Sequence, residues 1–103
     1  RQVHYSAQKM SSLHLGVGDI LLVQCPLEDV DRVHFVNTRV PRRWEENVNK
    51  ALAEGVELWP NAFLIDWNTA AADHPEYFRK DGVHLTGAGT EAYARLIAQS
   101  IQR

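Results

Sequence analysis

Three short apolar runs in the chain are each the length of a β-strand. They are Ile-Leu-Leu-Val-Gln at 20–24, Val-His-Phe-Val-Asn at 33–37 and Ala-Phe-Leu-Ile-Asp at 62–66. Continuous runs of this kind are typical of strands buried on both faces of a parallel sheet. Helical patterns alternate with them, so the sequence predicts an α/β fold with a short parallel sheet.

Apolar residues at helical spacing indicate two clear helices, one over residues 43–59 and one over about 88–102. The first dozen residues carry a weaker pattern that favours a helix as well. The residues of these three apolar faces are Trp44, Val48, Leu52, Val56 and Trp59; Ala92, Tyr93, Leu96, Ile97 and Ile101; and Val3, Ala7, Met10 and Leu13.

The connection between the first two apolar runs is unusually short. Only eight residues separate Gln24 from Val33, whereas a parallel crossover usually needs about a dozen or more. Either these two strands are not parallel neighbours, or the link is an abbreviated crossover.

Length and composition narrow the classes of protein that the chain can belong to. With 103 residues we expect one domain over 1–103. The net charge of −2 argues against a nucleic-acid partner, and a single cysteine excludes a disulfide within the chain. No apolar stretch approaches the ~20 residues of a membrane span. The chain opens on Arg1 rather than methionine, which we interpret as the cut or processed end of something longer.

Each of the three apolar runs ends in a polar residue, namely Gln24, Asn37 and Asp66. Ligands of open α/β sheets bind beyond the carboxyl ends of the strands. These side chains are therefore candidates for function, although polar residues also simply terminate strands.

The stretch Asp-Gly-Val-His-Leu-Thr-Gly-Ala-Gly, residues 81–89, brings an acid and a histidine within three positions. A carboxylate that accepts from one imidazole nitrogen fixes the tautomer and leaves the other nitrogen free as a general base. Asp81 and His84 are thus a candidate acid–base pair. The alternative is a helix-entry loop in which Asp81 or Thr86 bonds backbone amides and His84 has no role.

Longer stretches carry a resemblance to a known family. Residues 81–97 resemble the last sequence block of the SGNH (GDSL-like) hydrolase superfamily. Residues 33–52, followed by 60–67, are similar to the middle of SGNH domains attached to membrane acyltransferases, which include peptidoglycan and polysaccharide O-acetyltransferases. The resemblance runs from about Gly18 to Ile101.

This resemblance implies a flavodoxin-like three-layer sandwich, present here in truncated form, and a Ser–His–Asp triad. His84 would be the base and Asp81 its orienting acid. The chemistry implied is acyl transfer without a cofactor, on an acylated carbohydrate or small ester. The family is typically extracytoplasmic, and the chain itself has no visible targeting signal.

Two blocks of the family pattern are absent from the sequence. The only Gly-Asp is Gly18-Asp19, which Ile20 follows in place of serine, and Cys25-Pro26-Leu27 stands where a Gly-x-Asn block would supply oxyanion donors. We therefore expect little or no esterase activity from the isolated chain. The alternative is a non-catalytic binding or assembly module. A missing first strand would leave a sheet edge open to self-association or to a separate N-terminal segment.

Other candidate site residues have two readings each. Cys25 could replace the serine, or fill the core as an apolar side chain. Arg39, Arg42 or Arg43 could bind an anionic sugar or phosphate, or belong to a solvated turn. Asn37 could bind substrate, or simply end its strand. Trp67 could stack on a sugar ring or close the core. The five histidines are scattered without metal-ligand spacing, so no metal site is expected.

Overall fold

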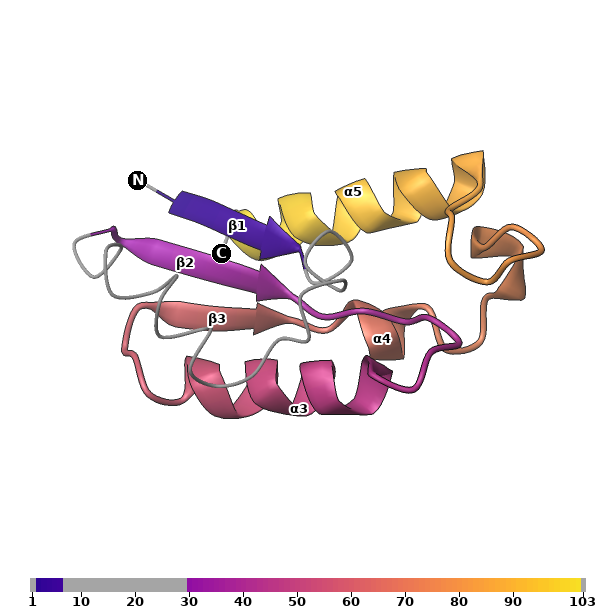
Figure 1. Ribbon diagram of the computed structural model, residues 1–103. Helices are drawn as coiled ribbons and strands as arrows, with labels where there is room; N and C mark the ends of the chain where they lie inside the picture. The colour runs from indigo at the N-terminus through magenta and orange to yellow at the C-terminus, as the bar shows by residue number, and fades with distance from the viewer. Residues whose placement is uncertain (1, 7–29, 103) are drawn as a thin grey trace.

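The computed structural model describes residues 2–6, by their backbone, and residues 30–102. Three strands and several helices alternate along the chain (Figure 1). In order they are β1 (Gln2–Ser6), β2 (Arg32–Val36), α3 (Glu45–Val56), β3 (Ala62–Ile65), α4 (Trp67–Ala70), the 3-10 helix η3 (Pro75–Tyr77) and α5 (Gly87–Ile101).

The strands form one parallel sheet in the order β1-β2-β3. Val33 of β2 lies opposite Val3 of β1 and Ala62 of β3. The strands predicted at 33–37 and 62–66 are confirmed, each ending one residue early. The strand predicted at 20–24 lies outside the described residues. The short link between Gln24 and Val33 begins outside them as well, so its two alternatives stay predictions.

The helix predicted over the first dozen residues is wrong where the structure describes them. Residues 2–6 are strand β1, which pairs along its whole length with β2. The spacing of Val3, Ala7, Met10 and Leu13 suggested a helix, but parallel pairing with a distant strand decides the conformation, since propensity is a weak prior beside tertiary contacts.

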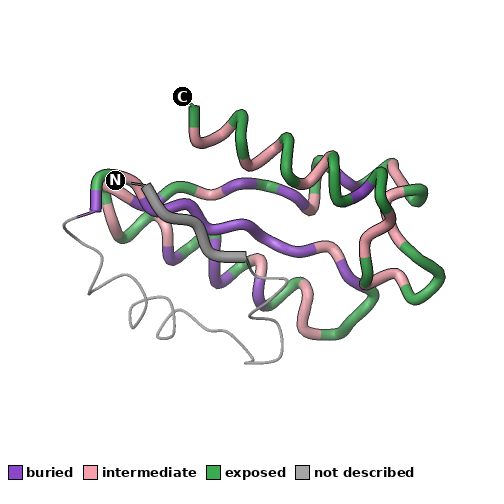
Figure 2. Tube along the Cα trace, turned by 90° about the horizontal axis from the view of Figure 1, so that it is seen from above, coloured by how far each residue is buried: buried purple, intermediate pink, exposed green. Residues whose placement is uncertain are grey.

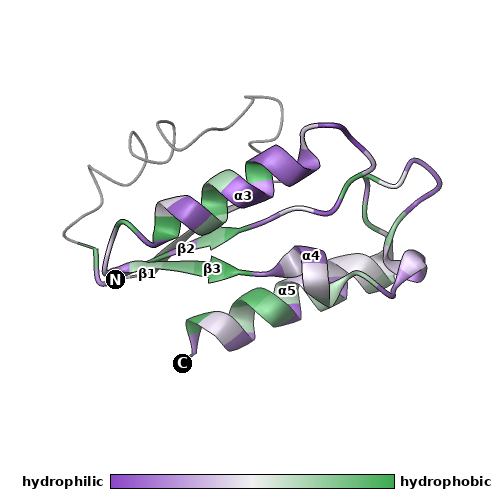
Figure 3. Cartoon of the chain, turned by 90° about the horizontal axis from the view of Figure 1, so that it is seen from below, coloured by the Kyte–Doolittle hydropathy of each residue, from purple (hydrophilic) through white to green (hydrophobic). Residues whose placement is uncertain are grey.

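The two faces of the sheet are covered by different helices, which gives three layers (Figures 1 and 3). Val33 and Phe35 pack with Val48 and Leu52 of α3. On the other face, the cluster that packs with α5 consists of Val36, Ile65, Trp67 and Ala71. The alternation along β2 follows from the two-residue period of a strand. The predicted α/β sandwich with a short parallel sheet is thus confirmed.

Burial is concentrated in the strands rather than in α5, in which only Gly89 is buried (Figure 2). None of the described helices combines the length and apolar character that crossing a membrane requires.

Candidate functional site

Two of the polar residues predicted at strand ends meet at the carboxyl edge of the sheet. The Asn37 side-chain amide donates to Asp66 Oδ1 at 2.8 Å, and its oxygen accepts from the backbone N–H of Asn68 at 2.8 Å. Asp66 also accepts from the N–H and hydroxyl of Thr69, and so caps the start of α4. Burial opposes ionisation of Asp66, but these hydrogen bonds outweigh it and hold its pKa below the usual value. Asn37 is therefore a buried tie between β2 and α4.

The loop that follows β2 is held by hydrogen bonds to α3. Asn49 accepts from the Thr38 N–H at 2.9 Å and donates to its carbonyl at 2.8 Å. Glu45 accepts from the Val40 N–H at 2.6 Å. These bonds satisfy backbone groups of a buried loop, so its conformation is fixed at the edge of the sheet.

Asp81 and His84 are in direct contact. Asp81 Oδ2 lies 2.5 Å from His84 Nδ1, and Asp81 Oδ1 accepts from the N–H groups of Val83 and His84 at 2.9 and 3.0 Å. The hydrogen bond to His84, followed by the two backbone bonds, holds the pKa of Asp81 well below its usual range. The imidazole is mostly exposed, with Nε2 at the opposite side of the ring from the carboxylate.

The loop that carries this pair is closed by short-range bonds. The Arg79 N–H donates to the His84 carbonyl at 2.8 Å, and the Gly82 N–H donates to the Arg79 carbonyl at 2.9 Å. Gly82 has a φ of 72°, a conformation that favours glycine. A side chain there would also meet Pro41 at 3.0 Å. The two stretches that carried the family resemblance therefore touch, at Pro41 and Gly82.

The helix-entry reading of this loop also holds, through Thr86. The Thr86 hydroxyl accepts from the Gly89 N–H at 3.1 Å, donates to the Glu76 carbonyl at 2.7 Å, and so caps α5. Its backbone N–H donates to the Tyr77 carbonyl at 2.9 Å. Thr86 thus fixes the start of α5, whereas Asp81 holds the His84 ring.

The remaining candidates lie apart from this pair. Trp67 is 1% exposed and packs against Tyr77, Phe78 and Tyr93, so the core role is the one that its position supports. Arg39 is half-buried near α4. Cys25 and Gln24 lie outside the described residues. In the part of the chain that the structure describes, no three metal-ligating side chains are grouped.

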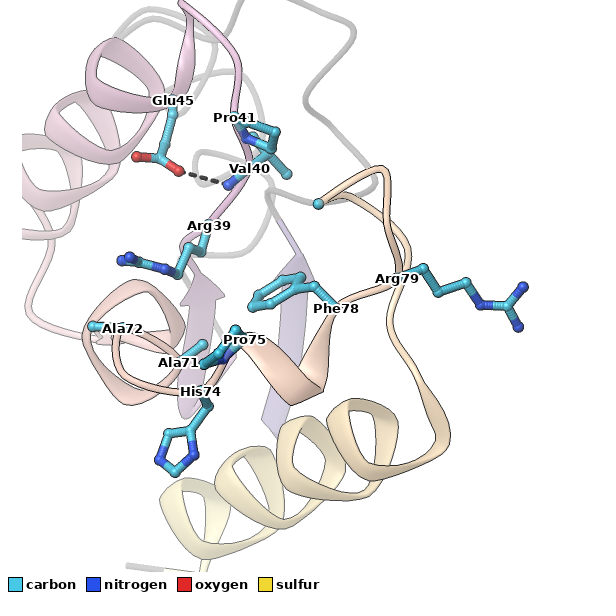
Figure 4. A pocket seen from close by; sticks show the side chains of 11 residues that line it. Arg39, Val40, Pro41, Glu45, Ala71, Ala72, His74, Pro75, Phe78 and Arg79 are labelled. Atoms are coloured by element: carbon cyan, nitrogen blue, oxygen red, sulfur yellow. Dashed lines mark hydrogen bonds between the residues drawn. The ribbon is translucent and has the colours of Figure 1, made fainter.

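A cavity of about 620 Å³ adjoins the Asp81–His84 loop (Figure 4). Its lining comes from the loop after β2, the start of α3 and the segment from α4 to Gly82. The lining residues are Arg39, Val40, Pro41, Glu45, Ala71, Ala72, His74, Pro75, Phe78, Arg79 and Gly82. The sequence signalled Arg39 but not the cavity, because its walls come from segments about thirty residues apart.

The depressed pKa of Asp81 predicts how acid affects stability. The pKa of Asp81 is lower in the folded state than in the unfolded state. The charged carboxylate therefore stabilises the fold fully at pH values above the unfolded-state pKa. The stabilisation is lost as the pH falls through the folded pKa. In Asp81→Asn the side-chain oxygen can still accept from the two backbone N–H groups. We expect the variant to be less stable than the parent chain at neutral pH.

Urea unfolding at a series of pH values measures this difference. We expect it to shrink as the pH falls below about 4, where the unfolded carboxylate takes up its proton. A difference that stays constant down to pH 2 would contradict the stabilising role of the charge.

Comparison with known proteins supports the resemblance. No protein-family model matches the chain. A Bacillus subtilis protein assigned as a peptidoglycan O-acetyltransferase, YrhL, is 46% identical over 70 residues, which are 68% of this chain and 11% of that protein. The O-acetyltransferase OatA of Staphylococcus aureus is 43% identical over 70 residues, 68% of this chain and 12% of its own length.

A further protein of Staphylococcus aureus strain MSSA476, assigned as an O-acetyltransferase, is 39% identical over 113 residues. That match covers 99% of this chain and 18% of the relative. The chain thus spans between a tenth and a fifth of the length of these relatives. The chain is thus similar to these O-acetyltransferases, and it corresponds to the C-terminal portion of a membrane-acyltransferase SGNH-type domain.

Proposed function

We propose that the chain supplies the acid–base half of an acyl-transfer site that acts on O-acetyl groups of carbohydrate, with peptidoglycan as the polymer. The observation that carries this proposal is the 2.5 Å contact between Asp81 Oδ2 and His84 Nδ1. The names of the relatives support the acetyl group and, for the Bacillus subtilis protein, the polymer.

In this mechanism His84 moves the proton and Asp81 holds the ring. With Nδ1–H bonded to the carboxylate, Nε2 is the free base. It takes the proton of a serine hydroxyl as the serine oxygen attacks the acyl carbonyl. The same proton then goes to the departing sugar oxygen, which leaves an acyl-serine. A hydroxyl of the acceptor, or water, releases the acyl group by the reverse sequence. Asp81 stays ionised throughout and stabilises the imidazolium that forms at each step.

The serine and the oxyanion donors are assigned to residues outside this sequence, because it has neither a Gly-Asp-Ser nor the Gly-x-Asn block. A positioned base without a nucleophile and oxyanion hole lacks most of what lowers the barrier. The isolated chain is therefore expected to hydrolyse p-nitrophenyl acetate no faster than its His84→Ala variant, as measured by nitrophenolate release. Rapid turnover by the chain that is lost in His84→Ala would show that the nucleophile lies within it.

A chimera tests the positive half of the proposal. An N-terminal SGNH segment that carries Gly-Asp-Ser would be joined ahead of this chain. We expect esterase activity that falls by about three to four orders of magnitude in His84→Ala or Asp81→Asn, the size of a lost triad member. Lys80→Ala is the matched control, since Lys80 is exposed beside Asp81 and does not line the cavity. Equal activity of the His84→Ala and parent chimeras would refute the role of His84.

The absence of Gly-Asp-Ser favours one other function, a non-catalytic binding module. Such a module would bind an acetylated glycan saturably, and a chimera with a competent serine segment would still show no turnover. Both can be read from the same chimera, by calorimetry and by product release.

A further inference from the structure

The cavity beside the Asp81–His84 loop combines apolar walls with few charged groups. Pro41, Pro75 and Phe78 are among its apolar lining residues, and the Phe78 ring lies 6.2 Å from the ring of the buried Trp67. A volume of about 620 Å³ lies within the range of small-molecule sites. Gly82 and Arg79, from the loop that holds His84, form part of its wall. A ligand in this cavity therefore lies next to the proposed acid–base pair.

Arg39 lines this cavity and has no acidic partner among residues 30–102. The residue is half-buried, and its guanidinium donates one hydrogen bond, to the Asn68 carbonyl at 3.3 Å. A guanidinium carries five N–H donors. The donors that this carbonyl does not use are available to a ligand in a partly desolvated setting, where a charge-assisted bond is stronger than in water.

The other charged side chains that line the cavity either form hydrogen bonds with protein groups or point away from the cavity. One Glu45 carboxylate oxygen accepts from the Val40 N–H at 2.6 Å. His74 pairs with Glu76 at 2.8 Å and stacks on Tyr77 at 4.4 Å. Figure 4 shows the Arg79 side chain directed away from the other lining residues. One available cation beside one carboxylate suits a single negative charge better than the double charge of a phosphate.

We infer that the cavity binds an acidic carbohydrate, with its carboxylate on Arg39 and its ring against Phe78. The inference rests on the proposed function, which it deepens by naming the substrate class. The carboxylate would accept two parallel N–H bonds from the guanidinium, the geometry that favours arginine over lysine. An acyl group on the same sugar unit would then be presented toward the loop that holds His84.

Two sugars that differ only at one carbon test the inference. Methyl β-D-glucuronide carries a carboxylate where methyl β-D-glucoside carries a hydroxymethyl group. Titration of each into the chain at low salt, followed by amide chemical shifts in NMR spectra, gives their dissociation constants. We expect the glucuronide to bind about tenfold tighter, the ratio set by one charge-assisted pair. Inorganic phosphate is expected to compete only weakly.

Arg39→Gln is expected to abolish this tenfold preference, and Arg39→Lys to reduce it severalfold while keeping the charge. Arg42→Gln is the matched control, because Arg42 is exposed on the same loop, bonds to the Pro41 carbonyl and does not line the cavity. Equal binding of the two sugars by the parent chain would overturn the inference. So would a preference that survives Arg39→Gln, or tighter binding of phosphate than of glucuronide.

Two further measurements distinguish a loss of sugar preference from a loss of folding or of catalysis. Thermal unfolding of each variant shows whether it is folded, and Arg39→Lys serves if Arg39→Gln is not. The His84→Ala chain is expected to keep the full preference for the glucuronide. If the acyl-transfer proposal fails while the preference stands, the cavity remains an acidic-sugar site. If the preference fails while the chimera is active, only the substrate class is refuted.

Discussion

Gly89→Ala is expected to destabilise the domain by about 3 kcal/mol or more. A methyl group at this position would lie 2.0 Å from the Tyr77 carbonyl oxygen and 2.8 Å from its carbon. Backbone atoms cannot rotate out of the way as a side chain can, so α5 and η3 would have to separate. That movement would also break the bond by which Thr86 ties the start of α5 to η3.

Gly87→Ala is the matched control for this substitution. Both glycines lie in the first turn of α5, but a methyl group at Gly87 would meet nothing within 4 Å. We expect Gly87→Ala to be neutral or to stabilise the domain by about 0.5 kcal/mol, because alanine favours a helix. Urea unfolding followed by circular dichroism compares the two midpoints. Similar midpoints for both variants would contradict the close approach at Gly89.

Trp67→Ala is expected to cost about 4 kcal/mol, within the range for removing a large buried aromatic side chain. The indole is 1% exposed and lies between strand β3 and the segments that lead to the site. Its ring stacks on Tyr77 at 5.8 Å and meets the edge of Tyr93 of α5 at 5.0 Å. Its loss would leave a cavity beneath η3, which no small movement of three different segments can fill.

Phe63→Ala provides the comparison for Trp67→Ala. Phe63 is an aromatic residue of strand β3, four residues before Trp67, but it is 45% exposed. We expect its truncation to cost about 1 kcal/mol or less, measured by the same unfolding experiment. A tryptophan that merely presented a ring to a ligand would behave like Phe63. Equal costs for the two substitutions would therefore return Trp67 to the list of binding candidates.

The helices and strands whose conformation follows from their own apolar spacing were predicted from the sequence. The apolar run at 33–37 appears as β2, and the helix predicted over 43–59 appears as the shorter α3, Glu45–Val56. The spacing of Asp81 and His84 predicted a contact that the loop indeed forms, because residues three apart in a turn lie close without help from the rest of the chain. The polar strand ends Asn37 and Asp66 met for a similar reason, since neighbouring parallel strands end at the same edge.

Features that depend on distant segments were missed. Strand β1 exists through its pairing with β2, and nothing within Gln2–Ser6 outweighed the helical spacing of the apolar residues around it. The contact between Pro41 and Gly82 joins two motifs that the sequence keeps far apart. The cavity needs both of those segments at once. No period or propensity of a single stretch encodes such a meeting.

The hydrogen bonds in and around the loop that holds His84 close short stretches of chain. Little conformational entropy is therefore lost when the acid–base pair forms. The contacts Asp81–His84 and Glu76–Thr86 span three and ten residues. The tie between the strand ends at Asn37 and Asp66 spans 29. Closing a loop costs more entropy as it lengthens. The geometry of the Asp81–His84 pair therefore depends on its own loop. It can persist through insertions and deletions elsewhere in the domain, even where the residues opposite the pair are replaced.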